Sequence, residues 1–95
     1  MFAFEPESRP WEAWSERERS LLRLFGDQRG RIPDEAAVQL GWDFMYARPG
    51  CAILHKRGEL RETGIKRKAR KGMGRELVIT EKGLAVLTLA GRRAA

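Results

Sequence analysis

Start and stop signals for helices divide this chain into short elements, and they constrain its fold more than any other feature. Ser15 and Glu18 have the spacing of a capping box, in which each side chain satisfies a backbone N–H of the first helical turn. The leucines and the phenylalanine that follow form an apolar face. Glycine commonly ends a helix, so we predict that this first helix stops at Gly26 or Gly30.

Two further helices are predicted before residue 58. Pro33, with two acidic residues after it, has the pattern of a helix start, and Gly41 is a suitable stop. We interpret residues 42–46 as a turn. Proline is favoured at the first position of a helix, so a third helix is predicted over residues 49–57, with Gly58 closing it.

The sequence after Gly58 changes to the pattern of a β-hairpin followed by a helix. Strands are predicted over 60–68 and 75–80, joined by a flexible, basic tip that contains two glycines. Thr80 is placed to cap a last helix over residues 81–90. We therefore expect an N-terminal arm over 1–14, one domain over 15–91 and a flexible tail over 92–95. Phe2 and Phe4 are predicted to tuck the arm against the domain.

The apolar positions of these elements predict a single core. Periodic spacing selects one inward residue or more from each helix and strand. Trp11 and Trp14, just before the first helix, are interpreted as core residues, with a partner surface as the alternative. The predicted core residues are Leu21, Leu24, Phe25, Val38, Leu40, Leu54, Leu60, Leu77, Ile79, Leu84 and Leu87.

Charge is distributed unevenly along the 95 residues. Residues 1–45 carry a net charge of −3, and residues 46–95 carry +9. Such an imbalance indicates a polyanionic partner for the second half, most simply a nucleic acid. Cys51 is the sole cysteine, so no internal disulfide can form, and a reducing, cytoplasmic location is expected. The first ten residues lack the pattern of a signal peptide, and no apolar run approaches the length of a membrane span.

Three stretches, in this order and spacing, resemble the winged helix-turn-helix family of DNA-binding proteins. Residues 33–41 are similar to the second helix and turn of that family, and residues 49–60 to the end of its recognition helix. Residues 80–87 look like the helix that follows the wing in MarR-like regulators. The resemblance implies an α+β fold, with a three-helix core, a β-hairpin wing and a C-terminal helix.

The chain departs from the family pattern in two places. Tyr46, Ala47 and Arg48 stand where family members usually have Ser or Thr, and Glu59 stands where an apolar residue is more usual. The predicted fold tolerates both differences. A DNA sequence preference cannot be carried over from the family.

The resemblance places five candidate DNA contacts on or beside the third helix. The N-terminal side chains of a recognition helix face base edges in the major groove. Arg48 can donate two hydrogen bonds to one guanine, and Tyr46 can contact a phosphate or a thymine methyl group. Gly50 would let the helix approach the DNA backbone closely, while Lys56 and Arg57 would clamp a phosphate.

The hairpin supplies the strongest functional signal. Six cations and no acid lie between residues 65 and 75. One or two lysines are enough to protect a sheet edge from aggregation, so this number of cations indicates a further role. We interpret them as a phosphate-binding or minor-groove wing. The six candidate contacts are Lys66, Arg67, Lys68, Arg70, Lys71 and Arg75.

Other function classes have less support in the sequence. The single histidine and single cysteine lack further metal ligands, and no catalytic triad or phosphate-cradling loop is present, so no enzymatic activity, metal or cofactor is expected. The preferred function is a small transcriptional or replication regulator that binds double-stranded DNA. The alternatives are docking on an acidic protein, such as an RNA polymerase surface, and then RNA binding. Trp11, Trp14 and the last helix are candidates for a homodimer interface.

Overall fold

The computed structural model describes residues 10–94, and the side chains of residues 10–91. The predicted contacts of Phe2 and Phe4 lie outside this range. The elements, in chain order, are the short 3₁₀ helix η2 (Trp11–Ala13), α1 (Glu16–Phe25), α2 (Pro33–Leu40), α3 (Phe44–Arg57), β1 (Leu60–Lys68), β2 (Met73–Ile79) and α4 (Glu81–Ala94).

The first two helices begin and end where the sequence predicts. Ser15 Oγ accepts a hydrogen bond from the Glu18 backbone N–H at 3.1 Å, and the Ser15 N–H donates to Glu18 Oε1 at 3.2 Å. This capping box starts α1, and Gly26 follows its last residue. Pro33 begins α2, and Gly41 ends it with a left-handed backbone (φ 70°) that favours glycine.

The predicted start of the third helix was wrong. Helix α3 begins at Phe44, because Asp43 caps it by accepting a hydrogen bond from the Met45 N–H at 2.8 Å. Pro49 lies inside the helix, where its missing N–H leaves the Met45 carbonyl without its helical donor. The predicted stop holds, since Gly58 ends the helix with φ 91°.

The hairpin is a two-stranded antiparallel ladder that is irregular in its middle. Leu60 pairs with Ile79 at the base and Lys68 with Met73 near the tip, and the register shifts between Glu62 and Lys66. Strand β2 starts two residues earlier than predicted. An isolated antiparallel β-bridge also pairs Arg31, in the loop before α2, with Leu77 of β2. The tip is tied to α2, because Asp34 Oδ2 accepts a hydrogen bond from the Arg70 backbone N–H at 2.8 Å.

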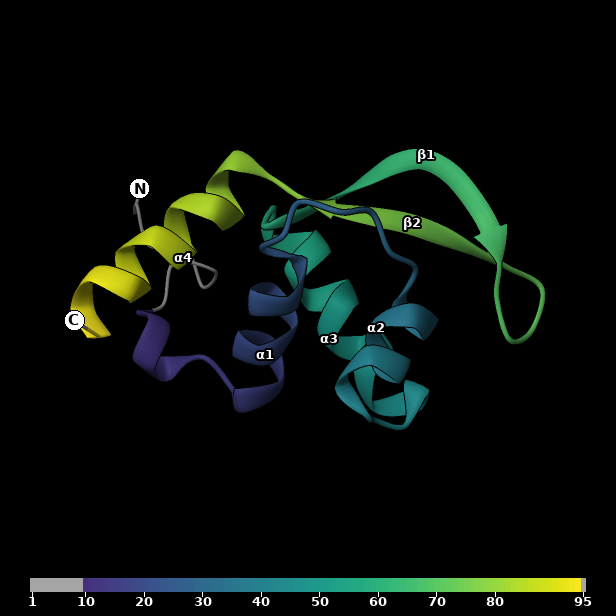
Figure 1. The fold of residues 1–95 in the computed structure, drawn as a ribbon, viewed down its shortest axis with the longest axis horizontal. Coiled ribbons are helices and arrows are strands. Elements are labelled where there is room, and N and C mark those ends of the chain that lie inside the picture. The colour runs from purple at the N-terminus through teal and green to yellow at the C-terminus, as the bar shows by residue number, and fades with distance from the viewer. Residues whose placement is uncertain (1–9, 95) are drawn as a thin grey trace, which may run out of the picture.

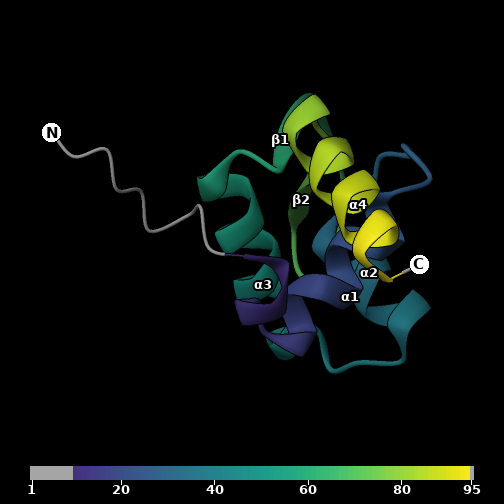
Figure 2. The same cartoon turned by 90° about the vertical axis from the view of Figure 1, so that its left-hand side faces the viewer.

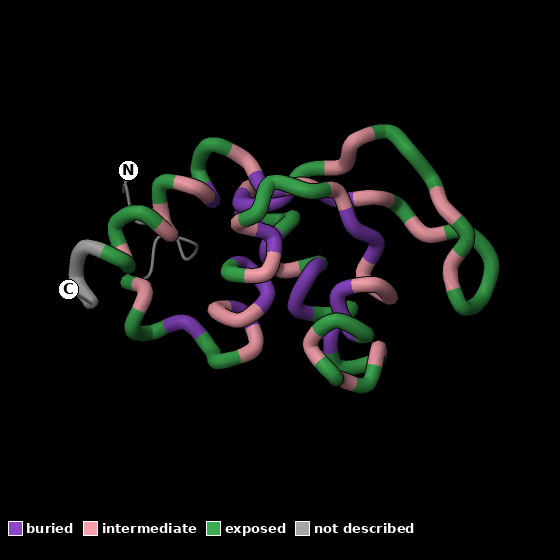
Figure 3. Tube along the Cα trace, viewed as in Figure 1, coloured by how far each residue is buried: buried purple, intermediate pink, exposed green. Residues whose placement is uncertain are grey.

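The core lies where α1, α2, α3 and the base of the hairpin meet (Figure 3). The predicted residues Leu21, Phe25, Leu54 and Leu60 are at most 1% exposed. Val38 was predicted wrongly, since it is 80% exposed on the outer side of α2. Trp14 is buried and Trp11 packs against it, which confirms the core interpretation of both tryptophans.

The last helix packs beside α1, and it extends past its predicted end (Figure 2). Thr80 caps α4 by accepting a hydrogen bond from the Gly83 N–H at 3.1 Å, and its hydroxyl donates to the Gly58 carbonyl at 2.6 Å. The predicted end near Ala90 was wrong, since the helix continues to Ala94. Leu84 and Leu87 are partly buried against the core.

The hairpin projects from one end of the three-helix cluster, and α4 covers the other end (Figure 1). This arrangement of three helices, a two-stranded wing and a following helix is the winged helix-turn-helix fold. Within residues 10–94 no helix has the length and apolarity to cross a membrane.

Candidate nucleic-acid interface

Helix α3 has one buried face and one exposed face. The buried residues follow a helical spacing of three or four and pack toward α1 and the hairpin base. They are Ala47, Gly50, Cys51, Leu54 and Arg57. The exposed residues on the opposite side are Met45, Arg48, Pro49, Ala52 and Lys56. Arg48 and Lys56, two of the predicted DNA contacts, therefore lie on the exposed face of α3.

Tyr46 lies on the flank of α3 that faces α1. The Arg17 guanidinium is 4.8 Å from the centre of the Tyr46 ring, and Arg17 Nη1 donates to the Tyr46 carbonyl at 3.3 Å. The ring also packs edge-on against Trp42 at 4.9 Å. Tyr46 is 45% exposed, so it borders the candidate interface rather than lying at its centre.

Gly50 does not face the solvent, so its predicted approach to DNA was wrong. A Cβ atom at this position would lie 2.5 Å from Leu21 Cδ1. Glycine is therefore needed to let α1 and α3 pack closely. The sequence signal was correct in indicating a close approach, but the partner is a helix of the same chain.

Arg57 was also assigned wrongly as a phosphate contact, because it is 8% exposed. Its Nε donates to Glu59 Oε1 at 2.9 Å, and its Nη1 lies 3.4 Å from Glu18 Oε1. The guanidinium stacks 4.0 Å from the centre of the Trp14 ring. Burial raises the pKa of the Glu59 carboxyl above its ordinary value, and the hydrogen bond from Arg57 opposes that rise. Glu59 thus replaces the usual apolar residue because a buried arginine lies beside it.

The wing residues divide between two faces of the hairpin, because directly paired residues share a face and strand neighbours alternate. Lys66 pairs with Arg75 and Lys68 with Met73, so these four share one face. Arg67, paired with Gly74, lies on the other.

The Arg67 guanidinium is occupied by acidic partners from the body of the domain, so its predicted role in phosphate binding is not supported. Its Nη2 donates to Glu35 and to the Gly30 carbonyl, and its Nε lies 3.1 Å from Glu76 Oε2. These contacts tether the wing to α2 and to the loop before it. Lys66, Lys68 and Lys71 are exposed and form no ion pair with the side chains of residues 10–91.

A groove of about 340 Å³ runs between α3 and the wing, and we call it the α3–wing groove. Arg48, Ala52 and His55 line it from the helix, while Lys71 and Arg75 line it from the wing. Asp34 and Glu62 also line this groove, and Glu62 lies beside its cations. Its Oε2 lies 3.0 Å from Arg75 Nη1 and 3.9 Å from His55 Nε2. The sequence interpretation assigned no role to Glu62.

Phe44 lies between the start of α3 and the wing tip. The Arg70 guanidinium lies 4.9 Å from the centre of the Phe44 ring, and that of Arg48 lies 5.8 Å from it. Both distances are within the range of cation–π attraction. Two of the predicted DNA contacts, 22 positions apart in the sequence, therefore gather around one aromatic ring.

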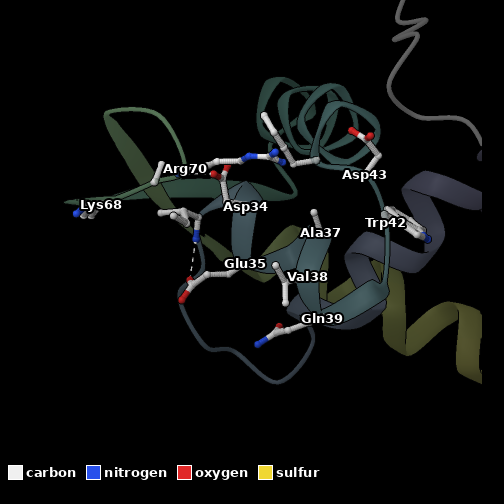
Figure 4. Close-up of a pocket in the computed structure, with 12 residues that line it drawn as sticks. Asp34, Glu35, Ala37, Val38, Gln39, Trp42, Asp43, Lys68 and Arg70 are labelled. Atoms are coloured by element: carbon white, nitrogen blue, oxygen red, sulfur yellow. Dashed lines mark hydrogen bonds between the residues drawn. The ribbon is translucent and has the colours of Figure 1, made fainter.

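A second hollow, of about 600 Å³, lies between α2 and the wing tip. Ala37, Val38 and Trp42 form its apolar part, and Lys68 and Arg70 border it from the wing (Figure 4). In the described residues no cluster of three or more His, Cys, Asp or Glu side chains could hold a metal ion. Burial raises the pKa of the Cys51 thiol to about 12, so this cysteine is not a reactive nucleophile at neutral pH.

Comparison with known proteins supports the fold through structure alone. No protein-family model matches the chain, and no curated protein matches its sequence. NMB1585, a MarR family regulator from Neisseria meningitidis, has a similar structure with a TM-score of 0.67 at 16% identity, over 87% of this chain and 56% of its own.

Two further solved structures are similar. A possible transcriptional regulator from Methanosarcina mazei Go1 gives a TM-score of 0.62 at 13% identity, covering 85% of this chain and 73% of its own. The disulfide form of AbfR gives 0.61 at 12% identity, covering 81% and 53%. The chain thus spans only a little over half the length of two of these proteins. At such identities the similarity establishes the winged helix-turn-helix fold.

Proposed function

We propose that this chain binds double-stranded DNA and acts as a small transcriptional or replication regulator. The α3–wing groove is the observation that carries the proposal. It joins Arg48 on the exposed face of α3 to Lys71 and Arg75 on the wing, with Lys66 and Lys68 on the same wing face as Arg75. In this arrangement α3 enters the major groove, and the wing contacts phosphates or the minor groove.

The distribution of acidic side chains supports this orientation. Several acids near the wing are already engaged by positive or backbone donors of the same chain. Asp34 accepts a hydrogen bond from the Arg70 backbone N–H. Glu35 accepts one from the Arg67 side chain, and Glu62 accepts one from the Arg75 side chain. The lysines of the wing remain available, so the surface beside α3 keeps a positive potential for a polyanion. Structural neighbours described as regulators are consistent with the same function.

The salt dependence of binding tests the proposal. Replacing Arg70 and Lys71 together with alanine should flatten the slope of log affinity against log salt by about two units, because each neutralised phosphate contributes roughly 0.9. Thermal stability should change little, since both residues are exposed at the tip. Fluorescence anisotropy with a labelled duplex at several salt concentrations would measure the slope. Unchanged affinity and slope would remove the wing from the interface and favour docking on an acidic protein.

Arg48 is expected to provide base discrimination. Arg48→Ala should weaken binding to a preferred duplex by about 1–3 kcal/mol and flatten the preference at one base pair, because a bidentate contact to guanine would be lost. Competition between preferred and random duplexes measures this difference. Lys56→Ala, on the same exposed face, is the matched control and should weaken both duplexes equally. An equal loss for Arg48→Ala on both would exclude base recognition by this residue.

Glu62 is expected to restrain the affinity of the interface. Glu62→Gln should tighten duplex binding by about fivefold, since two unit charges about 4 Å apart in water interact by roughly 1 kcal/mol. The substitution removes a negative charge from the groove and frees Arg75. Glu81→Gln, an exposed carboxylate at the start of α4, should leave the affinity unchanged. Titration at low salt measures both variants, and weaker binding by Glu62→Gln would contradict the proposed path of the DNA.

A further inference from the structure

The outermost line of α3 is apolar, although the surface around it is basic. Met45, Pro49 and Ala52 are spaced by four and then three residues, so they lie one above another on the same side of the helix. All three residues are exposed, and Met45 is 67% exposed. We call these three residues the apolar ridge. Leu54 and the other buried residues occupy the opposite face of the helix.

Charged side chains border the apolar ridge. Lys56 continues the same line toward the end of α3, and Arg48 and His55 lie on its wing side, where they line the α3–wing groove. An apolar strip with a cation beside it (Arg48) and another at its end (Lys56) matches a surface where phosphates border an apolar group. The major groove of DNA has this arrangement wherever a thymine is present.

The chemistry of the major groove restricts what the ridge can recognise. Base edges there present hydrogen-bond donors and acceptors, and the one apolar group is the C5-methyl of thymine. Met45, Pro49 and Ala52 have no side-chain hydrogen-bonding group, so they cannot satisfy a base donor or acceptor that they cover. Burying an apolar side chain on a methyl group is favourable, whereas burying it on an unsatisfied polar edge is costly.

We propose that the apolar ridge recognises thymine methyl groups, so that the target site holds thymines beneath α3 and a guanine beside them under Arg48. This inference rests on the proposed DNA binding. Met45 and Ala52 are seven residues apart, which is roughly 10 Å along a helix that rises 1.5 Å per residue. That length corresponds to about three base-pair steps of 3.4 Å. Two or three thymines within about three consecutive base pairs therefore contact the ridge.

Replacing thymine with uracil tests the proposal, because uracil differs only by the missing methyl group. A preferred duplex is first selected from random sequences with the full chain, and each thymine is then replaced singly by uracil. Adjacent positions beneath α3 should each lose affinity by about fourfold, the factor that corresponds to roughly 0.8 kcal/mol for one buried methyl-sized group. Uracil in the flanking sequence should have no effect.

Met45→Ala identifies the residue that contacts the methyl group. The variant should bind the thymine and uracil forms equally at one of the sensitive positions, and it should fold normally because Met45 is exposed. Met73→Ala is the matched control. Met73 is a methionine of similar exposure, 64%, on the wing, and its replacement should leave the thymine-to-uracil difference intact.

Two outcomes would overturn the inference, and they are distinguishable. If the fully uracil-substituted site binds within twofold of the thymine site, the ridge does not recognise methyl groups, while DNA binding stands. If selection recovers no duplex at all, the proposed function fails as well. The apolar ridge would then be the contact surface for a protein partner.

Discussion

Arg57→Ala is expected to lower the free energy of unfolding by about 3–5 kcal/mol, the range observed when one partner of a buried ion pair is removed. Arg57 lies between Glu18 and Glu59, and all three side chains are at most 7% exposed. Alanine would remove the cation and also the surface on which Trp14 stacks. Urea denaturation monitored by tryptophan fluorescence measures the change.

The adjacent lysine provides a control that separates structure from DNA contact. Lys56→Ala should leave stability nearly unchanged and reduce the salt slope of DNA binding by roughly 0.9, as loss of one phosphate contact requires. Arg57→Ala should do the reverse. A reduced slope with normal stability in Arg57→Ala would restore its role in phosphate binding and contradict its buried position.

The stability loss in Arg57→Ala should depend on pH in a defined direction. Burial already raises the pKa of the Glu59 carboxyl above its ordinary value of 4.5, and the variant loses the hydrogen bond that opposes this rise. A carboxyl whose pKa is raised in the folded state favours folding at low pH, and this contribution is lost as pH rises through the folded pKa. The difference between the variant and the original protein should therefore be larger at pH 7 than near pH 4.5.

Local signals in the sequence predicted most element boundaries, since caps and glycines act within a few residues. The capping box at Ser15, the stops at Gly41 and Gly58 and the cap at Thr80 were all confirmed. Pro49 was misleading because two start signals compete in this region. Asp43 caps the helix six residues before Pro49, and the proline is tolerated inside the helix at the cost of one hydrogen bond.

Candidate contacts in the interface could be predicted from the sequence where many cations lie close together. They could not be predicted where a basic side chain is buried by the fold. Lys66, Lys68, Lys71 and Arg48 are exposed as expected. Arg57 is also an arginine of α3, but Glu18, 39 residues away in the chain, holds it inside together with Glu59. The sequence pattern around Arg57 gives no sign of an ion pair with a residue that is far away in the chain. The apolar ridge begins at Met45, which the sequence prediction placed in a turn before the third helix. The sequence analysis therefore could not identify the ridge.

Val38 shows the same limit within the core. Its spacing in α2 matched an inward position, yet the buried residues of this helix are Ala36 and Ala37, and Val38 is 80% exposed. Small residues on the inner face allow α2 to pack closely against α3. Hydrophobicity alone ranks valine above alanine, so the pattern selected the wrong face of a short helix.

Leu54→Ala is expected to cost about 2–5 kcal/mol of stability, the range for a buried leucine truncated to alanine. Leu54 is 0% exposed and belongs to the core cluster with Leu21, Phe25 and Leu60. Because Leu54 anchors the inner face of α3, the cavity should also loosen the helix that carries Arg48, so affinity for duplex DNA should fall together with stability.

Val38→Ala is the matched control for Leu54→Ala, since the sequence pattern placed both residues in the core. An exposed valine should be replaceable with a change within about 0.5 kcal/mol. Thermal and urea denaturation of the two variants would compare them directly. If Val38→Ala proved as destabilising as Leu54→Ala, α2 would have to be rotated relative to α3. The positions of Asp34 and the Arg70 contact at the wing tip would then be wrong as well, because both depend on the orientation of α2.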